Sequence, residues 1–291
     1  ERNYQIESYV LPRIFGLFFN QNKNLLFANK VITKAIDQAI DKDKIVQKIL
    51  FNYGNAIDDP IPPNMIAYQK LSAENNSSRE LTLQNIQNNL AKDGWSKGPD
   101  GFLQKITIDK NKKKTTTILE FSISTGNAEE LIKTAEIIKE NLSKIGIKVN
   151  IKTFEIGNLN QSVIRPRDYD ALLFGQIINH ESDLFAFWHS SQRKDPGLNV
   201  AIYTNAKADK ILEDASITIN EQARIKKYAQ FEDQIKKNMP AVFLYSPNFI
   251  YIVSKNLKGL SINHIISPAD RFLSIYSWYT ETENVWRIFT K

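Results

Sequence analysis

The sequence predicts an α/β fold, and three adjacent segments carry that prediction. Apolar and polar residues alternate over residues 118–124 and again over 147–152, which is the pattern of strands with one buried face. Between them, residues 127–145 carry apolar side chains in steps of four and three, the stripe of a helix that packs on a sheet. A strand, a helix and a strand in this order form a βαβ unit, which should cross over with a right hand.

The N-terminal elements are expected from the same periodicities. Residues 9–20 should be extended and lead to Asn20. Helical spacing then covers residues 32–40, and Asp41 is a candidate N-cap for a second short helix. The loop 58–63 holds three prolines, which lack amide donors and fix the backbone, so it cannot be helical.

The middle of the chain should contain a short amphipathic helix over residues 81–90. A hairpin should follow, in which residues 102–108 pair with 118–124 across a lysine-rich tip. In the helix of the βαβ unit, Asn127 is the expected N-cap, and Gly146 suits the left-handed residue that ends many helices.

The C-terminal half should alternate helices with strands. Helices are expected over residues 206–217 and 220–237, and two separate buried strands over 241–245 and 249–253. The tail, residues 268–291, is rich in aromatic side chains. Such an apolar surface needs a cover, which is either the rest of this chain or something outside it.

The composition bounds the function classes. A chain of 291 residues has room for about two domains, and with 42% hydrophobic and 24% charged residues it is of globular type. The absence of cysteine excludes disulfides, thiol catalysis and zinc sites built on sulfur. The net charge is +6, but the lysine run 112–114 is best read as a solvated hairpin tip, so no nucleic-acid partner is expected.

The best candidate for a functional site is the segment 167–190. A strand is expected over residues 169–174, followed by Gly175 and a polar loop that includes Asn179 and Asp183. Loops that follow such strands are where α/β proteins usually place a ligand. The alternative, a core strand followed by an ordinary surface loop, remains open at this point.

Catalytic and metal sites are not expected. His180, Glu181, Asp183 and His189 lie close in the sequence, but the HExxH spacing of zinc hydrolases is absent. Two carboxylates two positions apart in a loop are usually solvated, whereas acid–base catalysis needs environments that split their pKa values. No GxSxG, GxGxxG or P-loop motif is present, so no cofactor is expected.

Six sequence blocks, taken in order, resemble the extracellular solute-binding proteins of family 5, the dipeptide, oligopeptide and nickel receptors of ABC importers. The blocks are KAIDQAIDKDKIV (34–46), DPIPP (59–63), NNLAKDGW (88–95), RDYDALLFG (167–175), YTNAKADKILEDA (203–215) and MPAVFLYSP (239–247). Their order and spacing are more specific than any single block.

The resemblance implies an α/β fold of the two-lobed periplasmic-binding-protein type (class II, cluster C), with the ligand enclosed between the lobes. Members of the family are much longer than this chain. Residues 20–243 would be the second lobe, and residues 1–19 and 244–291 would belong to the first lobe. The hinge would then lie near Phe19–Asn20 and Leu244–Tyr245.

The resemblance also implies the ligand contacts. Peptide-binding members often carry a Gly-Trp pair and then an Asp that holds the peptide's amino group; here Gln176 follows the glycine, and Asn179 stands near the acidic position. Glu181 or Asp183 could supply the charge instead. The expected ligand-binding residues are Gly175, Gln176, Asn179, His180 and Asp183 in the loop region, and Phe18 and Tyr245 beside the hinge.

The function that the resemblance implies is that of the extracytoplasmic substrate-binding component of an ABC importer, which binds a peptide-like solute and is not an enzyme. Its partners would be the solute and the ABC permease subunits. It would act in the periplasm or at the outer face of the cytoplasmic membrane, held there only by a lipid anchor, as in a lipoprotein, or by the permease. The alternatives are a sensor or surface-binding module of the same fold, and a metal-assisted hydrolase.

Overall fold

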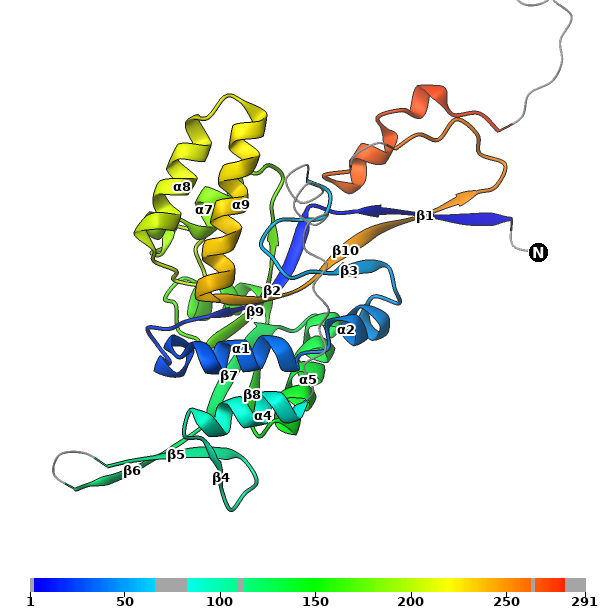
Figure 1. Cartoon of the computed structure of the whole chain (residues 1–291). Helices are drawn as coiled ribbons and strands as arrows, with labels where there is room; N and C mark the ends of the chain where they lie inside the picture. Colours follow the sequence, from blue (N-terminus) through cyan, green and yellow to red (C-terminus); the bar gives the residue numbers. More distant parts are fainter. Residues whose placement is uncertain (1–2, 66–82, 109–111, 263–264, 281–291) are drawn as a thin grey trace, which may run out of the picture.

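The computed structural model describes residues 3–65, 83–108, 112–262 and 265–280, which form an α/β body and a two-stranded arm (Figure 1). The main sheet has the strand order β1-β10-β2-β9-β7-β8, and β3 pairs with β10 beside this path. Its strands are β1 (Tyr4–Val10), β2 (Arg13–Phe19), β3 (Gly54–Ala56), β7 (Glu120–Gly126), β8 (Lys148–Phe154), β9 (Ala171–Ile177) and β10 (Ala241–Ser254).

Helices cover both faces of this sheet. One layer consists of η1 (Leu25–Ala28), α1 (Lys30–Ala39), α2 (Lys42–Ile49), α4 (Leu83–Lys92) and α5 (Glu129–Lys144). The other consists of α6 (Ile156–Asn158), the π-helical η2 (Leu159–Ile164), α7 (Asp183–Trp188), η3 (Ser190–Gln192), α8 (Ala206–Ile217) and α9 (Glu221–Asn238). A second, small sheet holds β4 (Ser96–Lys97), β5 (Leu103–Ile108) and β6 (Lys114–Ile118), and the short turns η4 (Pro268–Phe272) and η5 (Ile275–Ser277) lie beside the arm.

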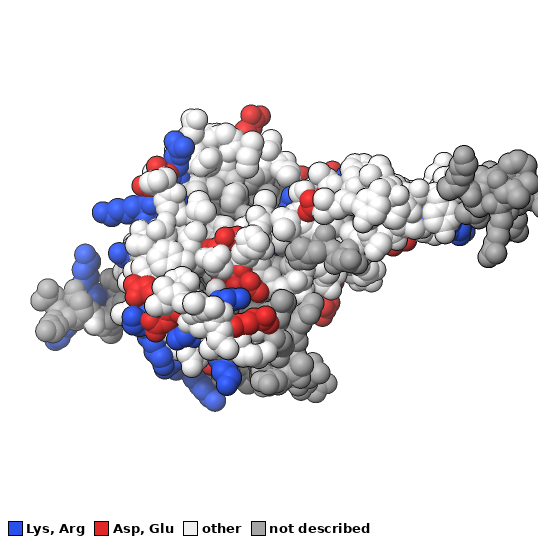
Figure 2. All heavy atoms as spheres, turned by 90° about the horizontal axis from the view of Figure 1, so that it is seen from above, with Lys and Arg blue, Asp and Glu red and all other residues white. Residues whose placement is uncertain are grey.

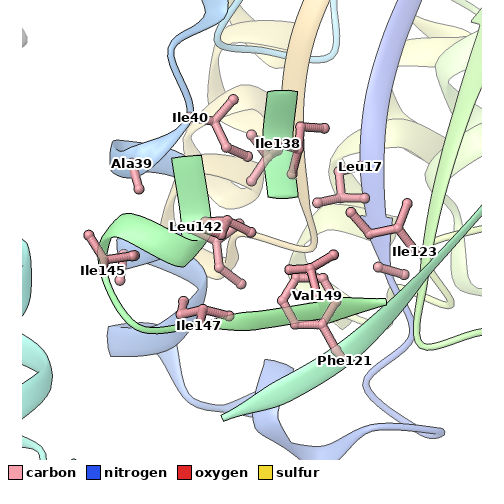
Figure 3. Packing of buried hydrophobic residues seen from close by; sticks show 14 of the residues in the cluster. Leu17, Ala39, Ile40, Phe121, Ile123, Ile138, Leu142, Ile145, Ile147 and Val149 are labelled. Atoms are coloured by element: carbon pink, nitrogen blue, oxygen red, sulfur yellow. The ribbon is translucent and has the colours of Figure 1, made fainter. Parts of the chain in front are cut away.

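The βαβ prediction is confirmed. Strands β7 and β8 are parallel, with Phe121 opposite Val149, and α5 connects them. Figure 3 shows apolar side chains of both strands and of α5 meeting in one core, to which Leu17 of β2 also contributes. Leu17, Ile138 and Leu142 have no exposed surface. Each such side chain contributes roughly 1.5–3 kcal/mol by leaving water.

Polar N-caps begin several helices as the sequence indicates. The Asp41 carboxylate accepts a hydrogen bond from the Lys44 amide at 2.9 Å, and the amide oxygens of Asn205 and Asn220 cap α8 and α9. Each such cap is worth about 1 kcal/mol. The expected cap Asn127 is wrong, because the N-cap of α5 is Ala128, which offers no side-chain acceptor.

The predicted hairpin is correct in its first strand and wrong in its second. Strand β5 pairs with β6, which ends at Ile118, whereas residues from Glu120 onward form β7 in the main sheet. The two strands separate at Leu119, whose side chain is fully buried and whose amide donates to the Leu103 carbonyl at 2.7 Å. One continuous extended segment therefore serves two sheets.

Two further strand boundaries differ from the sequence prediction. Strand β9 runs to Ile177, so Gly175 and Gln176 lie inside the strand and not in the loop after it. The two strands expected over 241–245 and 249–253 are one, β10, which bends at a register shift between Phe243 and Tyr245. Its second half pairs with β1 to form the arm.

The arm consists of β1 and the second half of β10, and β2 belongs to the body. Strand β2 lies in the centre of the sheet, with Ile14 and Leu17 fully buried, so residues 13–19 are part of the body. The aromatic tail partly packs on the arm, where the Trp278 and Tyr251 rings are 6.5 Å apart. Tyr276 remains 88% exposed, and residues 281–291 of the tail lie outside the described part of the chain.

The described surface is mixed in charge. Figure 2 shows acidic and basic side chains interspersed over the body, with few on the arm. No helix in the described ranges is long and apolar enough to cross a membrane.

Charged side chains connect the proline loop to helices α1 and α2. The Lys42 ammonium, from a side chain only 1% exposed, lies 2.9 Å from the Asp37 carboxylate and 2.7 Å from that of Asp58. The neighbouring Asp59 accepts a hydrogen bond from the Ile61 amide. Burial raises the pKa of Asp59 to about 7, and the negative charge of Glu232 on α9 adds to the rise.

We predict that Asp59→Asn removes a pH dependence of stability. Because the folded state raises the pKa of Asp59 to about 7, its stabilising contribution is complete below its unfolded pKa of about 3.9 and is lost as pH rises through the folded value. Between about pH 5 and pH 8, the free energy of unfolding of the wild type should fall by on the order of 2 kcal/mol relative to the variant. Urea unfolding over this range measures it, with exposed Asp233→Asn on α9 as control; parallel curves for the wild type and Asp59→Asn would contradict the prediction.

Candidate functional site

The site is built where β2 and β9 pair. In this antiparallel register Phe15 stands opposite Gly175, and Arg13 stands opposite Ile177. A β-carbon on Gly175 would lie 2.7 Å from the nearest atom of the Phe15 ring, closer than such atoms approach. A glycine is therefore required at position 175 so that the ring can lie across the strand.

Tyr245 supports the Phe15 ring from behind. The two rings are stacked, with centroids 4.9 Å apart and planes 19° from parallel. Tyr245 is 2% exposed, and burial raises the pKa of its hydroxyl to about 12, so the hydroxyl is neutral at physiological pH. The stack thus forms a rigid apolar wall.

Beside this wall lies a recess of about 200 Å³. Its lining residues are Arg13, Phe15, Leu131, Phe174, Gly175, Gln176 and Ile177. Phe174 and Ile177 bracket a stretch of β9 that has β2 on one side only. Strand β7 pairs with β9 from Ala171 to Leu173 and then ends at Gly126, so residues 174–177 have no strand neighbour on that side among the described residues.

Two polar atoms of the lining residues are buried without a hydrogen-bond partner in the described part of the chain. They are Nε of Arg13 and the side-chain oxygen Oε1 of Gln176. Gln176 is only 3% exposed and pairs with Ile14, so its side chain lies on the opposite face of the sheet from Arg13 and Phe15. A buried polar group that lacks a partner costs about 1–3 kcal/mol, so such groups mark places where a further molecule can bind.

The loop after β9 holds the other predicted contacts. The Asp183 carboxylate accepts hydrogen bonds from the backbone amides of Asn179 and His180, at 2.9 and 3.1 Å. Asp183 therefore closes the loop, while the side chains of Asn179 and His180 are exposed. The structure brings Gly175 and Gln176 to the recess and places Asn179, His180 and Asp183 in the loop that follows.

The two residues expected beside the hinge lie inside the body. Phe18 has no exposed surface and packs against Trp188, with ring centroids 6.1 Å apart. Tyr245 reaches the recess only through Phe15. Neither side chain lines the recess, because Phe18 is 0% exposed and Tyr245 only 2%.

His180 and His189 have separate surroundings. His189 stacks on Phe185 at 4.1 Å, and its Nε2 lies 3.5 Å from a Glu213 carboxylate oxygen, whereas His180 is exposed in the loop. The described residues contain no group of three or more His, Cys, Asp or Glu that could hold a metal ion.

A larger recess of about 400 Å³ lies between α1 and α4. Its polar lining residues are Lys34, Gln38, Asn89, Lys92 and Asp93. No described polar atom among them is both buried and unpartnered, and Asp93 already accepts hydrogen bonds from Asn29 and Trp95. We therefore centre the site on the smaller recess.

Of the residues that line the recess, Gly175 and Gln176 were expected from the sequence, whereas Arg13, Phe15 and Leu131 were not. Arg13 and Phe15 could have been grouped from the sequence, because residues two apart on one strand lie on the same face. Which strand lies beside that face depends on the pairing register, and a single sequence does not show it.

Comparison with known proteins gives consistent matches. The bacterial extracellular solute-binding proteins, family 5 Middle, match residues 1–197. The oligopeptide-binding protein AppA of Bacillus subtilis strain 168 is 30% identical over 259 residues, which make up 88% of this chain and 45% of that protein.

Solved structures show the same fold. AppA from Bacillus subtilis in complex with a nonapeptide superposes with a TM-score of 0.75 at 28% identity, over 97% of this chain and 53% of that one. NikZ from Campylobacter jejuni in complex with Ni(L-His) superposes with a TM-score of 0.75 at 25% identity, over 96% and 54%. The chain thus spans about half the length of these relatives, and the predicted fold class is confirmed.

We predict that Gly175→Val destabilises the body and closes the recess. The new side chain would meet the Phe15 ring, which is itself held by Tyr245. Forced repacking of this kind costs about 1–3 kcal/mol. Urea unfolding measures the loss, and Gly157→Ala is the control because no atom lies within 4 Å of that position. Equal stabilities of the two variants would contradict the role assigned to Gly175.

Proposed function

This chain belongs to the family 5 bacterial extracellular solute-binding proteins, and from that premise we propose that it supplies one jaw of the peptide-binding component of an ABC importer. The family binds solutes, so the chain is a receptor and not an enzyme. It acts outside the cytoplasm and hands its ligand to the permease subunits. The membrane is reached through a lipid anchor or through the permease alone.

The body formed around residues 13–247 is the second lobe, and the arm and the tail belong to the first. The chain leaves the body at Leu11–Pro12, where the Leu11 amide donates to the Pro247 carbonyl at 3.2 Å. The chain crosses between the body and the arm at Leu11–Pro12 and again near Pro247, and these two neighbouring crossings form the hinge. Ligand contacts that form only when the lobes close supply the free energy of closure.

The ligand is a peptide held by its backbone. The observation that carries this proposal is the four-residue edge of β9, residues 174–177, which lies open beside the recess. An extended peptide can add to such an edge through main-chain hydrogen bonds, while side chains point alternately into pockets. Because Gly175 has no side chain, nothing at this position projects beside the edge, and the Phe15 ring forms the apolar wall next to it.

The polar loop completes the site from one end. Asn179, His180 and Asp183 follow β9 directly and lie where they can meet the terminus of a peptide on the edge. Asp183 already accepts two backbone amides, and the exposed Asn179 offers a neutral amide. An amide binds an ammonium less strongly than a free carboxylate does, so this end contributes less than the backbone edge.

We predict that the native-length protein binds short peptides and depends on their main-chain amides. Isothermal titration with unmodified peptides should show binding, and the same peptides N-methylated at alternate positions should bind about 3- to 10-fold more weakly for each hydrogen bond lost. N-methylation at the intervening positions is the matched control and should matter less.

Ni(L-His) and oligosaccharides complete the titration panel. Binding of either one, with no binding of any peptide, would contradict the peptide proposal but leave a solute receptor. No binding by any of these ligands would favour the sensor or surface-binding alternative over import.

A further inference from the structure

Arg13 differs from the other arginines of the described chain. It lies at the start of β2, two positions before Phe15, so its side chain is on the same face of the sheet and lines the same recess. Its Nε is shielded from solvent and has no hydrogen-bond partner, and no carboxylate of the described residues lies within 4.0 Å of its guanidinium.

Every other described arginine has at least one partner. The guanidinium of Arg167, for example, donates to three backbone carbonyls at 2.6 to 3.0 Å, and that of Arg193 donates to the Ser190 carbonyl and the Thr204 hydroxyl. The remaining members of this group are Arg165, Arg224 and Arg271. These arginines connect neighbouring segments of the fold, whereas Arg13 makes no such contact within the described part of the chain.

A guanidinium nitrogen that loses water without gaining a partner is unfavourable for the empty lobe. The cost is recovered when an anion enters the recess, since the planar donor fork of arginine matches the two oxygens of a carboxylate. The apolar side chains of Phe15 and Leu131 line the recess beside Arg13.

We propose that Arg13 is a charge-selecting contact and that the preferred peptides carry a carboxylate in this recess. The proposal rests on the proposed function, because it concerns a peptide lying along residues 174–177. The carboxylate is either the C-terminus of the ligand or an acidic side chain. Both present the same two oxygens to Arg13.

The test uses the native-length protein and three versions of one neutral peptide. The first is amidated at its C-terminus, the second has a free C-terminus, and the third is amidated but carries Glu in place of one Gln. Isothermal titration at low and moderate salt gives each affinity. We expect the wild type to prefer one carboxylate-bearing peptide by about 10-fold or more over the first peptide.

Variants assign that preference to Arg13. Arg13→Gln should abolish the preference, so that the neutral and the carboxylate-bearing peptides bind this variant alike, and Arg13→Lys should retain part of the preference as a point charge without the planar donor geometry. The surface variant Arg165→Gln, whose side chain is 59% exposed, should behave as the wild type. If Arg13→Gln fails to fold, the wild-type to Arg13→Lys comparison decides alone.

The outcomes separate this inference from the proposed function. A preference for the second peptide identifies the ligand's C-terminus as the source of the carboxylate, and a preference for the third identifies an acidic side chain. Equal affinity for all three peptides, or an unchanged preference in Arg13→Gln, overturns the role of Arg13 and leaves the peptide receptor intact. Binding of none of them overturns both.

Discussion

The structure depends on the position of β2 between β9 and β10. Seven residues near the N-terminus pair in β9 with partners more than 150 positions away, and all of them except Arg13 and Phe15 are buried. Leu17 and Phe19 enter the core beneath α1 and α5, while Ile14 and Phe18 enter the core beneath α7, α8 and α9. Both cores therefore require the same long-range pairing, as does the recess that Arg13 and Phe15 line.

The contact between Phe15 and Gly175 shapes the surface beside this strand pairing. The Phe15 ring lies over Gly175 and is stacked on Tyr245. The sheet therefore presents an apolar wall next to the stretch of β9 that has a strand neighbour on one side only. A recess bounded on one side is suited to a clamp, because the second jaw supplies the missing wall only when it closes. In the proposed clamp, the arm leads away from the body at Leu11 and Pro247 and belongs to the first lobe.

The comparisons separate fold from ligand. A nonapeptide complex and a nickel–histidine complex superpose on this chain equally well, both with a TM-score of 0.75. The fold thus accommodates ligands of different chemistry, and the choice among them rests with the side chains at the recess. In this chain the recess is lined by Arg13, whose Nε is buried without a partner among the described residues, and by apolar side chains that include Phe15 and Leu131.

The sequence alone determined the elements whose signals are local. The stripe of α5 and the cap Asp41 depend on neighbours within a few positions along the chain. Gly175 was expected from the sequence as a ligand contact, but its place inside β9, the division of residues 114–126 between β6 and β7, and the continuity of β10 were decided by tertiary structure. The physical reason is that strand limits and register depend on which distant strand supplies the hydrogen bonds. The same pairing brings Arg13 to Gly175, and no local pattern encodes that proximity.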